Sequence, residues 1–243
     1  MRQNAFIRRL LAPFQQTPFH PQWFVYRDER ESLLAIGRQA RGLTFDIGAG
    51  AQQVRNYLPS GCRYLSLDYY QTAAEWYRTR PQLFGDGQRL PIKANSVDTV
   101  LLLDVLEHLP RPENCIAEIR RVLRPGGRLV LQVPFLYPLH DAPYDFHRWT
   151  IHGLRTLAER YEFDIESEMV RGHPAESAAL LTNLAISKTV LNWLRTKNPL
   201  VLLSPLLLTA VPAINIRGWL LARLSGEERF MPHSYRVVWG KSA

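Results

Sequence analysis

The most informative segment of this chain is Phe45-Asp46-Ile47-Gly48-Ala49-Gly50-Ala51, where an apolar run ends in an acidic residue and two glycines. Glycines directly after a strand let the backbone turn sharply and approach a ligand closely. A dinucleotide fingerprint would need another glycine at position 53, where this chain has Gln53. That departure disfavours a nicotinamide oxidoreductase, which stays open as an alternative.

Aspartates recur at the ends of the following apolar runs. Asp68 lies 18 residues after Gly50, and Asp86 and Asp104 follow at the same interval. This interval fits one strand–helix–strand repeat, so the carboxylates should line the carboxyl edge of a parallel sheet, where open α/β sheets bind ligands. Asp68 is placed to accept hydrogen bonds from two ribose hydroxyls. A chance line-up of surface aspartates is the alternative.

Apolar runs and helix-like stretches alternate along the chain, which predicts a mixed α/β sheet. Strands are predicted over residues 43–47, 63–67, near 83, 97–103, 128–133, 162–168 and 235–239. Helices are predicted over 52–58, 72–78, 113–123 and, capped by Thr150, 151–160. A helix-terminating turn is expected at Arg124-Pro125-Gly126-Gly127.

Further motifs follow the first segment in a fixed order. They are Leu67-Asp68, Gly85-Asp86-Gly87-Gln88-Arg89-Leu90-Pro91, Ser96-Val97-Asp98, Asp104-Val105-Leu106-Glu107-His108-Leu109 and Leu123-Arg124-Pro125-Gly126-Gly127-Arg128-Leu129. With these motifs, roughly residues 40–170 resemble the class I S-adenosylmethionine-dependent methyltransferases. The departure is Ala51, where many members of the family carry a third glycine.

The resemblance implies a doubly wound, seven-stranded, Rossmann-like sheet with six parallel strands and an antiparallel last one. It also implies S-adenosyl-L-methionine as the cofactor. Asp46 and the backbone of Gly48, Ala49 and Gly50 would hold its methionine part. The remaining contacts would be Asp68 to the ribose, Tyr69, Asp86 and Gly87 to the adenine, and Leu103 with Asp104 beside the sulfonium. The pair Glu107-His108 is interpreted first as a helix start with a buried, hydrogen-bonded histidine.

The loop over residues 134–150 follows the fifth predicted strand and is dense in His, Asp, Tyr and Arg. It resembles the acceptor loop of methyltransferases that act on glycans, lipids and secondary metabolites. His140 with Asp141 is the candidate general base, because histidine titrates near neutral pH. The candidate acceptor-binding residues are Tyr144, Asp145, His147, Arg148 and Trp149. Alternatively, Asp145 and Arg148 pair to shape the loop. No metal is expected, since no HxH or HExxH spacing occurs.

The amino-acid composition and net charge exclude several other classes of protein. A hydrophobic fraction of 46% and a charged fraction of 21% exclude a largely disordered chain. Two cysteines, neither in a CxxC pair, exclude a disulfide framework. The net charge is +8, and half of it lies over residues 172–226, where five cations face only Glu176 (5 − 1 = +4). These cations are Lys188, Arg195, Lys197, Arg217 and Arg223. Basic and apolar together favour a membrane surface over nucleic acid.

Four segments are expected along the chain. Residues 1–40 form an N-terminal lid with a short amphipathic helix, residues 41–171 the cofactor-binding core, and residues 232–243 the final strand. Between them, residues 172–231 form a hydrophobic insertion, which the prolines at 199, 205 and 212 should divide into short helices over the cofactor site. The lid helix carries Phe6, Ile7, Leu10, Leu11 and Phe14.

The expected activity is O-methylation of an apolar, lipid-like or lipid-linked small molecule, in the cytoplasm or at the inner face of a membrane. A non-catalytic cofactor-binding or membrane-associated module is the alternative. No nucleic-acid partner is expected. The apolar insertion is expected to touch a membrane, and a homodimer interface is the other interpretation.

Overall fold

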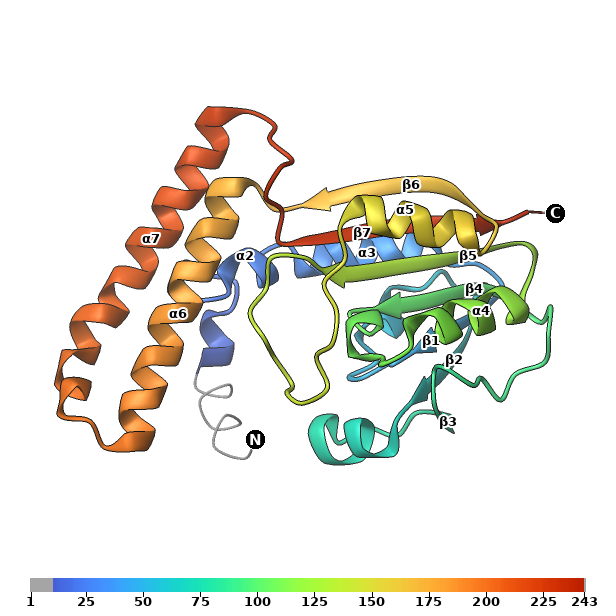
Figure 1. The fold of residues 1–243 in the computed structure, drawn as a ribbon, viewed down its shortest axis with the longest axis horizontal. Helices are drawn as coiled ribbons and strands as arrows, with labels where there is room; N and C mark the ends of the chain where they lie inside the picture. Colours follow the sequence, from blue (N-terminus) through green and yellow to red (C-terminus); the bar gives the residue numbers. More distant parts are fainter. Residues whose placement is uncertain (1–10, 243) are drawn as a thin grey trace. The chain divides into compact units, whose positions relative to one another are not determined.

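The computed structural model describes residues 11–242, and the chain divides into two compact units (Figure 1). One unit contains the chain up to Arg30, a short piece at residues 136–138 and the segment 172–233, and it is helical. The other contains residues 31–135, 139–171 and 234–243 and holds the β-sheet. We call them the helical unit and the sheet unit and describe each separately.

The sheet has seven strands in the order β3-β2-β1-β4-β5-β7-β6. β1 to β5 pair in parallel, and β7 pairs antiparallel with both β5 and β6. The predicted doubly wound sheet with one antiparallel strand is therefore confirmed. The strands are β1 Leu43–Ile47, β2 Arg63–Asp68, β3 Leu83–Phe84, β4 Val97–Leu103, β5 Leu123–Pro134, β6 Phe163–Arg171 and β7 Ser234–Lys241.

The sequences of the central strands are continuous apolar runs, because helices cover these strands. α4, Pro112–Val122, and α5, Ile151–Arg160, bury residues such as Ile116 and Leu157 in the main hydrophobic core. α3, Glu29–Gln39, contributes Ile36 to a second core with Leu101. The predicted cap of α5 is present, since the Thr150 hydroxyl accepts the Gly153 amide hydrogen at 3.0 Å.

Three local predictions on this scaffold differ from the structure. The segment predicted as a helix over 52–58 is a 3₁₀-helix, η2 Gln53–Tyr57, and the next connection is a π-helix, η3 Gln71–Tyr77. The expected turn after α4 is absorbed into β5, which begins at Leu123. A register shift between Val97 and Thr99 on the neighbouring strand accommodates the proline and glycines there.

The helical unit contains two long helices, α6 Pro174–Thr196 and α7 Ser204–Ser225, joined by the 3₁₀-helix η5 Pro199–Leu203. The prediction that the prolines divide this segment into short helices is wrong. Pro199 and Pro205 lie in the first turns of η5 and α7, where the missing N–H removes no bond, and only Pro212 lies inside a helix.

Close packing holds α6 and α7 together. A Cβ added at Gly218 of α7 would lie 2.8 Å from the Ala179 Cβ of α6, so glycine lets the two backbones approach. The buried Asn183 donates to Asn215 at 2.8 Å, and Asn215 in turn donates to the carbonyl of His20 at 3.0 Å. This polar chain fixes the helix pair against the N-terminal segment of the same unit.

The N-terminal segment carries a 3₁₀-helix, η1 Ala12–Phe14, and α2, Trp23–Tyr26. Of the predicted lid helix, Leu11 and Phe14 lie in or beside η1. Phe6, Ile7 and Leu10 lie outside the described residues.

Candidate functional site

The glycine turn after β1 and the carboxylate that ends β2 are joined by a hydrogen bond. The Gly50 amide donates to Oδ2 of Asp68 at 2.8 Å, and the Tyr69 amide donates to Oδ1 at 2.7 Å. Burial raises the pKa of Asp68, and these two amides oppose the rise. Gly48 and Gly50 have φ values of +69° and +48°, which disfavour side chains. Each Asp68 oxygen keeps a lone pair, so the carboxylate can also accept two ligand hydroxyls.

Asp46 lies beneath this turn and is only 3% exposed. Its Oδ2 accepts the Tyr64 hydroxyl at 2.6 Å. Burial raises the pKa of Asp46 to about 7, the Tyr64 hydrogen bond lowers it, and the nearby Asp68 raises it further. The carboxyl group of Asp46 is therefore buried and bonded to Tyr64, and the methionine-binding role assigned to it stays a prediction.

Tyr69, Asp86 and Gly87 lie on the segments that follow β2 and β3. Burial raises the pKa of Tyr69 to about 12, with contributions from its hydrogen bond to Asp86 and from the Asp86 charge. Asp86 closes its own turn by accepting the Gln88 amide at 2.8 Å. A Cβ at Gly87 would lie 3.2 Å from Ile47, so this turn packs tightly on β1. Parallel pairing of β2 and β3 brings Asp68 and the Asp86 turn to one edge, as predicted.

Asp104, after Leu103 at the end of β4, adopts a left-handed conformation with φ of +54°. Its amide donates to the Gln132 carbonyl at 2.9 Å, and its Oδ2 accepts Gln132 Nε2 at 2.7 Å. Gln132 also accepts Arg236 Nη2 at 2.7 Å. Sequence reasoning missed Gln132, because nothing in its local sequence distinguishes a glutamine inside an apolar strand.

The acceptor loop is organised around Asp145, whose side chain is 1% exposed. Arg148 donates to both of its oxygens, at 2.5 and 2.7 Å, so the alternative in which these two residues pair is the one the structure contains. Oδ2 of Asp145 lies 3.1 Å from Nδ1 of His140. The acid that the structure places beside the His140 ring is Asp145, whereas Asp141 takes φ of +49° in a turn whose carbonyl accepts the Tyr144 amide, so the catalytic role assigned to Asp141 stays a prediction.

The other predicted acceptor-binding residues have different environments. Tyr144 is 53% exposed. The rings of His147 and Trp149 lie 5.7 Å apart between centroids and are tilted by 42°. Their ring nitrogens Nε2 and Nε1 are buried without a hydrogen-bond partner among the described residues. Those buried nitrogens can bind a polar group that enters the loop, so acceptor contacts by these three residues stay a prediction.

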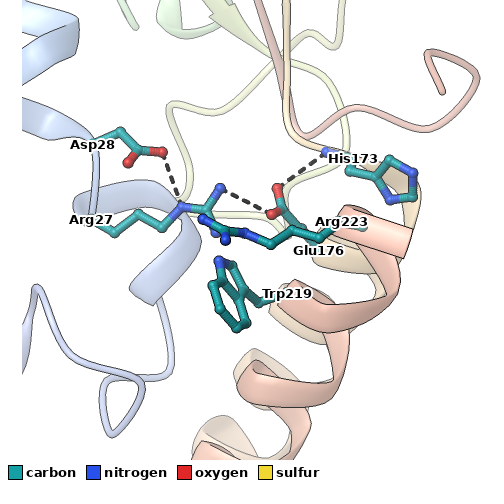
Figure 2. A pocket seen from close by; sticks show the side chains of 7 residues that line it. Arg27, Asp28, His173, Glu176, Trp219 and Arg223 are labelled. Atoms are coloured by element: carbon teal, nitrogen blue, oxygen red, sulfur yellow. Dashed lines mark hydrogen bonds and ion pairs between the residues drawn. The ribbon is translucent and has the colours of Figure 1, made fainter. Parts of the chain in front are cut away.

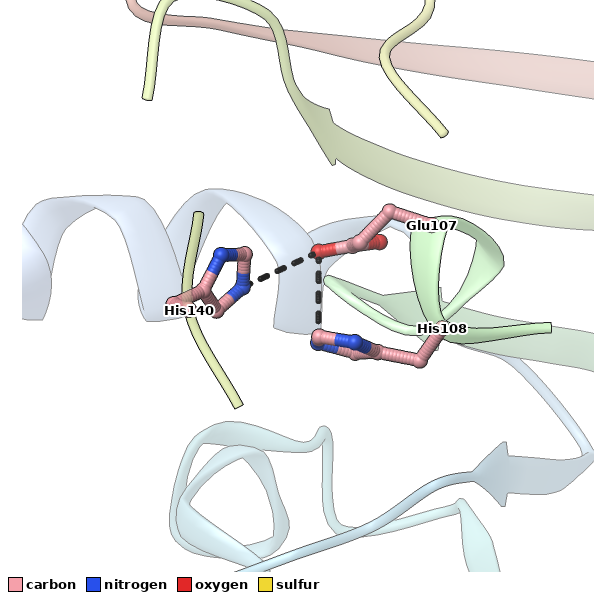
Figure 3. A group of neighbouring side chains, drawn as sticks. All are labelled: Glu107, His108 and His140. Atoms are coloured by element: carbon pink, nitrogen blue, oxygen red, sulfur yellow. Dashed lines mark ion pairs between the residues drawn. The ribbon is translucent and has the colours of Figure 1, made fainter. Parts of the chain in front are cut away.

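Glu107 and His108 lie in η4, Leu106–His108, directly after β4, and His140 approaches them from the acceptor loop (Figure 3). Oε1 of Glu107 is 3.8 Å from His108 Nε2 and 4.0 Å from His140 Nε2. Glu107 is fully buried, whereas His108 is partly exposed. Sequence reasoning favoured a structural role for this pair over a catalytic one. It missed the buried glutamate, because the burial of Glu107 depends on the loop that folds over it.

The helical unit has a polar pocket of its own (Figure 2). Arg27 bonds Glu176 at 2.9 Å and stacks on the ring of Phe24, while Arg223 lies 4.2 Å above the Trp219 ring. The pocket is lined by Arg27, Asp28, His173, Glu176, Trp219, Ala222 and Arg223. Both acids of the pocket, Asp28 and Glu176, pair with Arg27, each at 2.9 Å.

Known proteins resemble this chain both in sequence and in fold. The family model described as a methyltransferase domain matches residues 45–131. An uncharacterized methyltransferase of Mycolicibacterium paratuberculosis is 32% identical over 154 residues, covering 58% of this chain and 56% of that protein. The ubiquinone/menaquinone biosynthesis C-methyltransferase UbiE of Paraburkholderia phytofirmans is 33% identical over 100 residues, covering 39% and 40% of the two chains.

Among solved structures, a SAM-dependent methyltransferase from Archaeoglobus fulgidus superposes with a TM-score of 0.54 at 15% identity. The match covers 90% of this chain and 99% of that one, and it shows a shared fold. The first curated relatives are matched over only 30% and 56% of their own lengths.

Proposed function

Residues 45–131 of this chain belong to the class I S-adenosylmethionine-dependent methyltransferase family, and from this premise we propose that the protein transfers a methyl group to a small-molecule acceptor. One observation carries the proposal: the Asp68 carboxylate, held by the amides of Gly50 and Tyr69, keeps acceptor capacity at the carboxyl edge of the sheet. That arrangement fits a ribose bound across the glycine turn.

The cofactor of this family is S-adenosyl-L-methionine, which supplies an electrophilic methyl group. The backbone of Gly48, Ala49 and Gly50 would bind its methionine part above Asp46. Asp68 would accept from the ribose hydroxyls. Around the rest of the molecule, the proposed contacts are Tyr69, Asp86 and Gly87 at the base, and Leu103 and Asp104 beside the sulfonium.

His140 is the proposed general base for a hydroxyl acceptor. Its Nδ1 lies 3.1 Å from the Asp145 carboxylate. Burial would raise the pKa of that carboxylate, but hydrogen bonds from Arg148 and the His140 amide, together with the nearby positive charge, lower it to about 2, so Asp145 stays ionised. A proton held on Nδ1 leaves Nε2 as the basic nitrogen, which faces the interior of the loop beside Glu107. The expected gain from a positioned base is about 10²–10⁴-fold in rate.

The acceptor class is proposed from the composition of the helical unit. Of the described helices, the segment Pro199–Ser225 is long and apolar enough to cross a membrane by length and composition, with a mean hydropathy of 1.9 and 11% of its most apolar window buried. Leu202, Leu206 and Leu224 are 82%, 72% and 83% exposed. An apolar surface of this kind suits a lipid-like acceptor or the membrane that carries it.

Charge supports contact with an anionic membrane face. No acidic residue occurs between Glu176 and Glu227, while α6 and α7 carry cations. Arg223 lies over the ring of Trp219, and tryptophan is a residue type enriched at membrane interfaces. We therefore propose that the protein is peripheral, at the cytoplasmic side of a membrane. Burial of this surface in a homodimer is the competing proposal, which vesicle flotation distinguishes.

O-methylation is proposed over C-methylation because a histidine base is present. The name of the Paraburkholderia relative, a C-methyltransferase, gives the second candidate reaction. Incubation of the protein with cell extract and methyl-labelled S-adenosylmethionine tests both. Label in the organic phase that alkaline hydrolysis of esters or ether cleavage releases indicates O-methylation, and resistant label indicates C-methylation. No label in any fraction, from a protein that binds S-adenosylhomocysteine, favours the non-catalytic module.

A further inference from the structure

Two histidines and a glutamate converge inside the acceptor loop. Ligand atoms of Glu107, His108 and His140 all lie within 4.8 Å of one another (Figure 3). We propose that these three side chains bind a divalent transition-metal ion, which in turn binds an oxygen of the methyl acceptor. This proposal rests on the proposed function for the role of the ion, but the binding of the ion can be tested without it.

The buried carboxyl group of Glu107 favours a cation beside it. The residue is 0% exposed, and both of its carboxylate oxygens are buried without a hydrogen-bond partner among the described residues. Its backbone carbonyl accepts the amides of Phe146 at 2.9 Å and His147 at 3.2 Å, so the acceptor loop fixes its main chain. A buried carboxyl group without a hydrogen-bond partner is costly to ionise, and a cation bound between Glu107 and the two imidazoles would compensate its charge.

The orientation of the two imidazole rings also favours a bound ion. Nδ1 of His108 lies 2.7 Å from the Tyr144 carbonyl, which can only accept, so this nitrogen carries the proton. Nδ1 of His140 lies 3.1 Å from Asp145 and 3.4 Å from Arg148, and the closer carboxylate favours a proton on Nδ1 there too. Both rings then direct an unprotonated Nε2 to the side of Glu107. A carbonyl or carboxylate behind each imidazole is the usual arrangement around metal-binding histidines.

The distances between Oε1 of Glu107 and the two imidazole nitrogens also fit a shared ion. The two Nε2–Oε1 separations, 3.8 and 4.0 Å, are too long for hydrogen bonds. Ligand atoms that share an ion at about 2.1 Å lie about 3–4 Å apart. Small side-chain rotations therefore suffice to place an ion between them. A direct ion pair between a protonated histidine and Glu107 would instead be expected to close to hydrogen-bond distance.

The ligand set defines the chemical class of the ion. Two imidazoles and one carboxylate suit Zn²⁺, Fe²⁺, Mn²⁺ or Co²⁺, and three protein ligands leave positions open for substrate oxygen. Because Glu107 follows β4 and His140 follows β5, the open positions lie at the carboxyl edge of the sheet. With the ion bound, the Nε2 lone pair of His140 is used for coordination, so the ion would replace that nitrogen in activating the acceptor, by lowering the pKa of a coordinated hydroxyl. Such a site favours an acceptor with a hydroxyl or two adjacent oxygens.

Zn²⁺ and Co²⁺ titrations of the chelator-stripped, full-length protein test the site. We expect one ion per chain by calorimetry and visible absorption bands on Co²⁺ addition. Glu107→Gln, His108→Ala and His140→Ala should each weaken Zn²⁺ binding by at least about 10²-fold, and Asp145→Asn by about 10-fold. The matched controls His152→Ala and Glu159→Gln replace exposed residues of α5 and should bind as the unmodified protein does.

Binding of S-adenosylhomocysteine reports whether each variant is folded. If the folded, unmodified protein binds neither ion above the level of the site variants, or if His152→Ala weakens binding as much as His140→Ala, the metal site is wrong. Failure of the proposed function has a different signature: one bound ion per chain, with no methyl transfer to any extract fraction.

Discussion

Nδ1 of His140 lies 3.1 Å from Oδ2 of Asp145, five residues further along the same loop. The same carboxylate accepts the His140 amide at 2.9 Å and two bonds from Arg148. Asp145 therefore fixes both the main chain and the ring of His140. This relationship positions the Nε2 atom on which both the proposed base and the proposed metal site depend.

Asp68→Ala should weaken binding of S-adenosylhomocysteine. Loss of the carboxylate would leave two ligand hydroxyls unpaired, at a cost of about 1–3 kcal/mol, or roughly 5–150-fold in affinity. Isothermal titration calorimetry measures the change, with the exposed Asp164→Ala on β6 as the matched control. Unchanged affinity in a folded Asp68→Ala protein would show that this carboxylate does not bind the ribose.

His140→Ala should lower turnover by about 10²–10⁴-fold and leave affinity for S-adenosylhomocysteine unchanged. The reason is that His140 lies on the acceptor side and has no predicted contact with the cofactor. Label transfer to the acceptor fraction, measured from pH 6 to pH 9, checks it against His152→Ala. Turnover close to that of the unmodified protein across this range would contradict a role for His140, as base or as metal ligand, in the reaction.

Asp46→Asn should remove a specific pH dependence of stability. The pKa of Asp46 is raised from 3.8 to about 7 by burial, so between these values the folded protein holds a proton that the unfolded chain has lost. The stability that this proton contributes is complete below the unfolded-state pKa of Asp46. It is lost as pH rises through the folded-state pKa, by up to about 1.4 kcal/mol per pH unit. The asparagine keeps an acceptor for Tyr64 without a titrating proton.

Urea unfolding at pH 4, 5, 6 and 7 measures this effect. The free energy of unfolding of Asp46→Asn, relative to the unmodified protein, should increase steadily from pH 4 to pH 7. Asp164→Asn should show no such trend. Parallel curves for Asp46→Asn and the unmodified protein would mean that Asp46 titrates alike in the folded and unfolded states.

The helical unit should carry the protein onto anionic vesicles. Flotation with phosphatidylglycerol vesicles should exceed flotation with neutral vesicles and should fall as salt rises, because cations of α6 and α7 supply part of the attraction. The double change Leu202→Gln and Leu206→Gln should reduce the bound fraction, by about 10²-fold in partition coefficient if each leucine contributes about 1.5 kcal/mol.

The matched control, Ile165→Gln with Met169→Gln, removes two exposed apolar side chains from β6 and should leave flotation unchanged. A protein that never floats, yet sediments as a dimer that the leucine changes convert to monomer, would assign this surface to self-association. Vesicle association that neither added salt nor the two leucine substitutions reduce would also refute the proposed contact.

Local sequence determined the elements and the edge of the sheet that holds the candidate site. Strand periodicity and backbone conformation are local properties that neighbouring residues determine. They predict the strands that end near Asp68 and Asp104, and the glycine turn after Asp46. Parallel strands carry their carboxyl ends to one side, so the aspartates converge whatever the details of packing. The strand order and the antiparallel β7 came from the resemblance to a family.

Tertiary structure decided the partners of the side chains. Asp141 lies one residue and Asp145 five residues after His140 in the sequence, and in the fold it is the Asp145 carboxylate that lies 3.1 Å from the His140 ring. Glu107 is buried because a loop some forty residues later closes over it, a contact between elements that local periodicity does not encode. The long α7 persists through Pro212 because its packing on α6, with Gly218 against Ala179, outweighs one lost backbone bond.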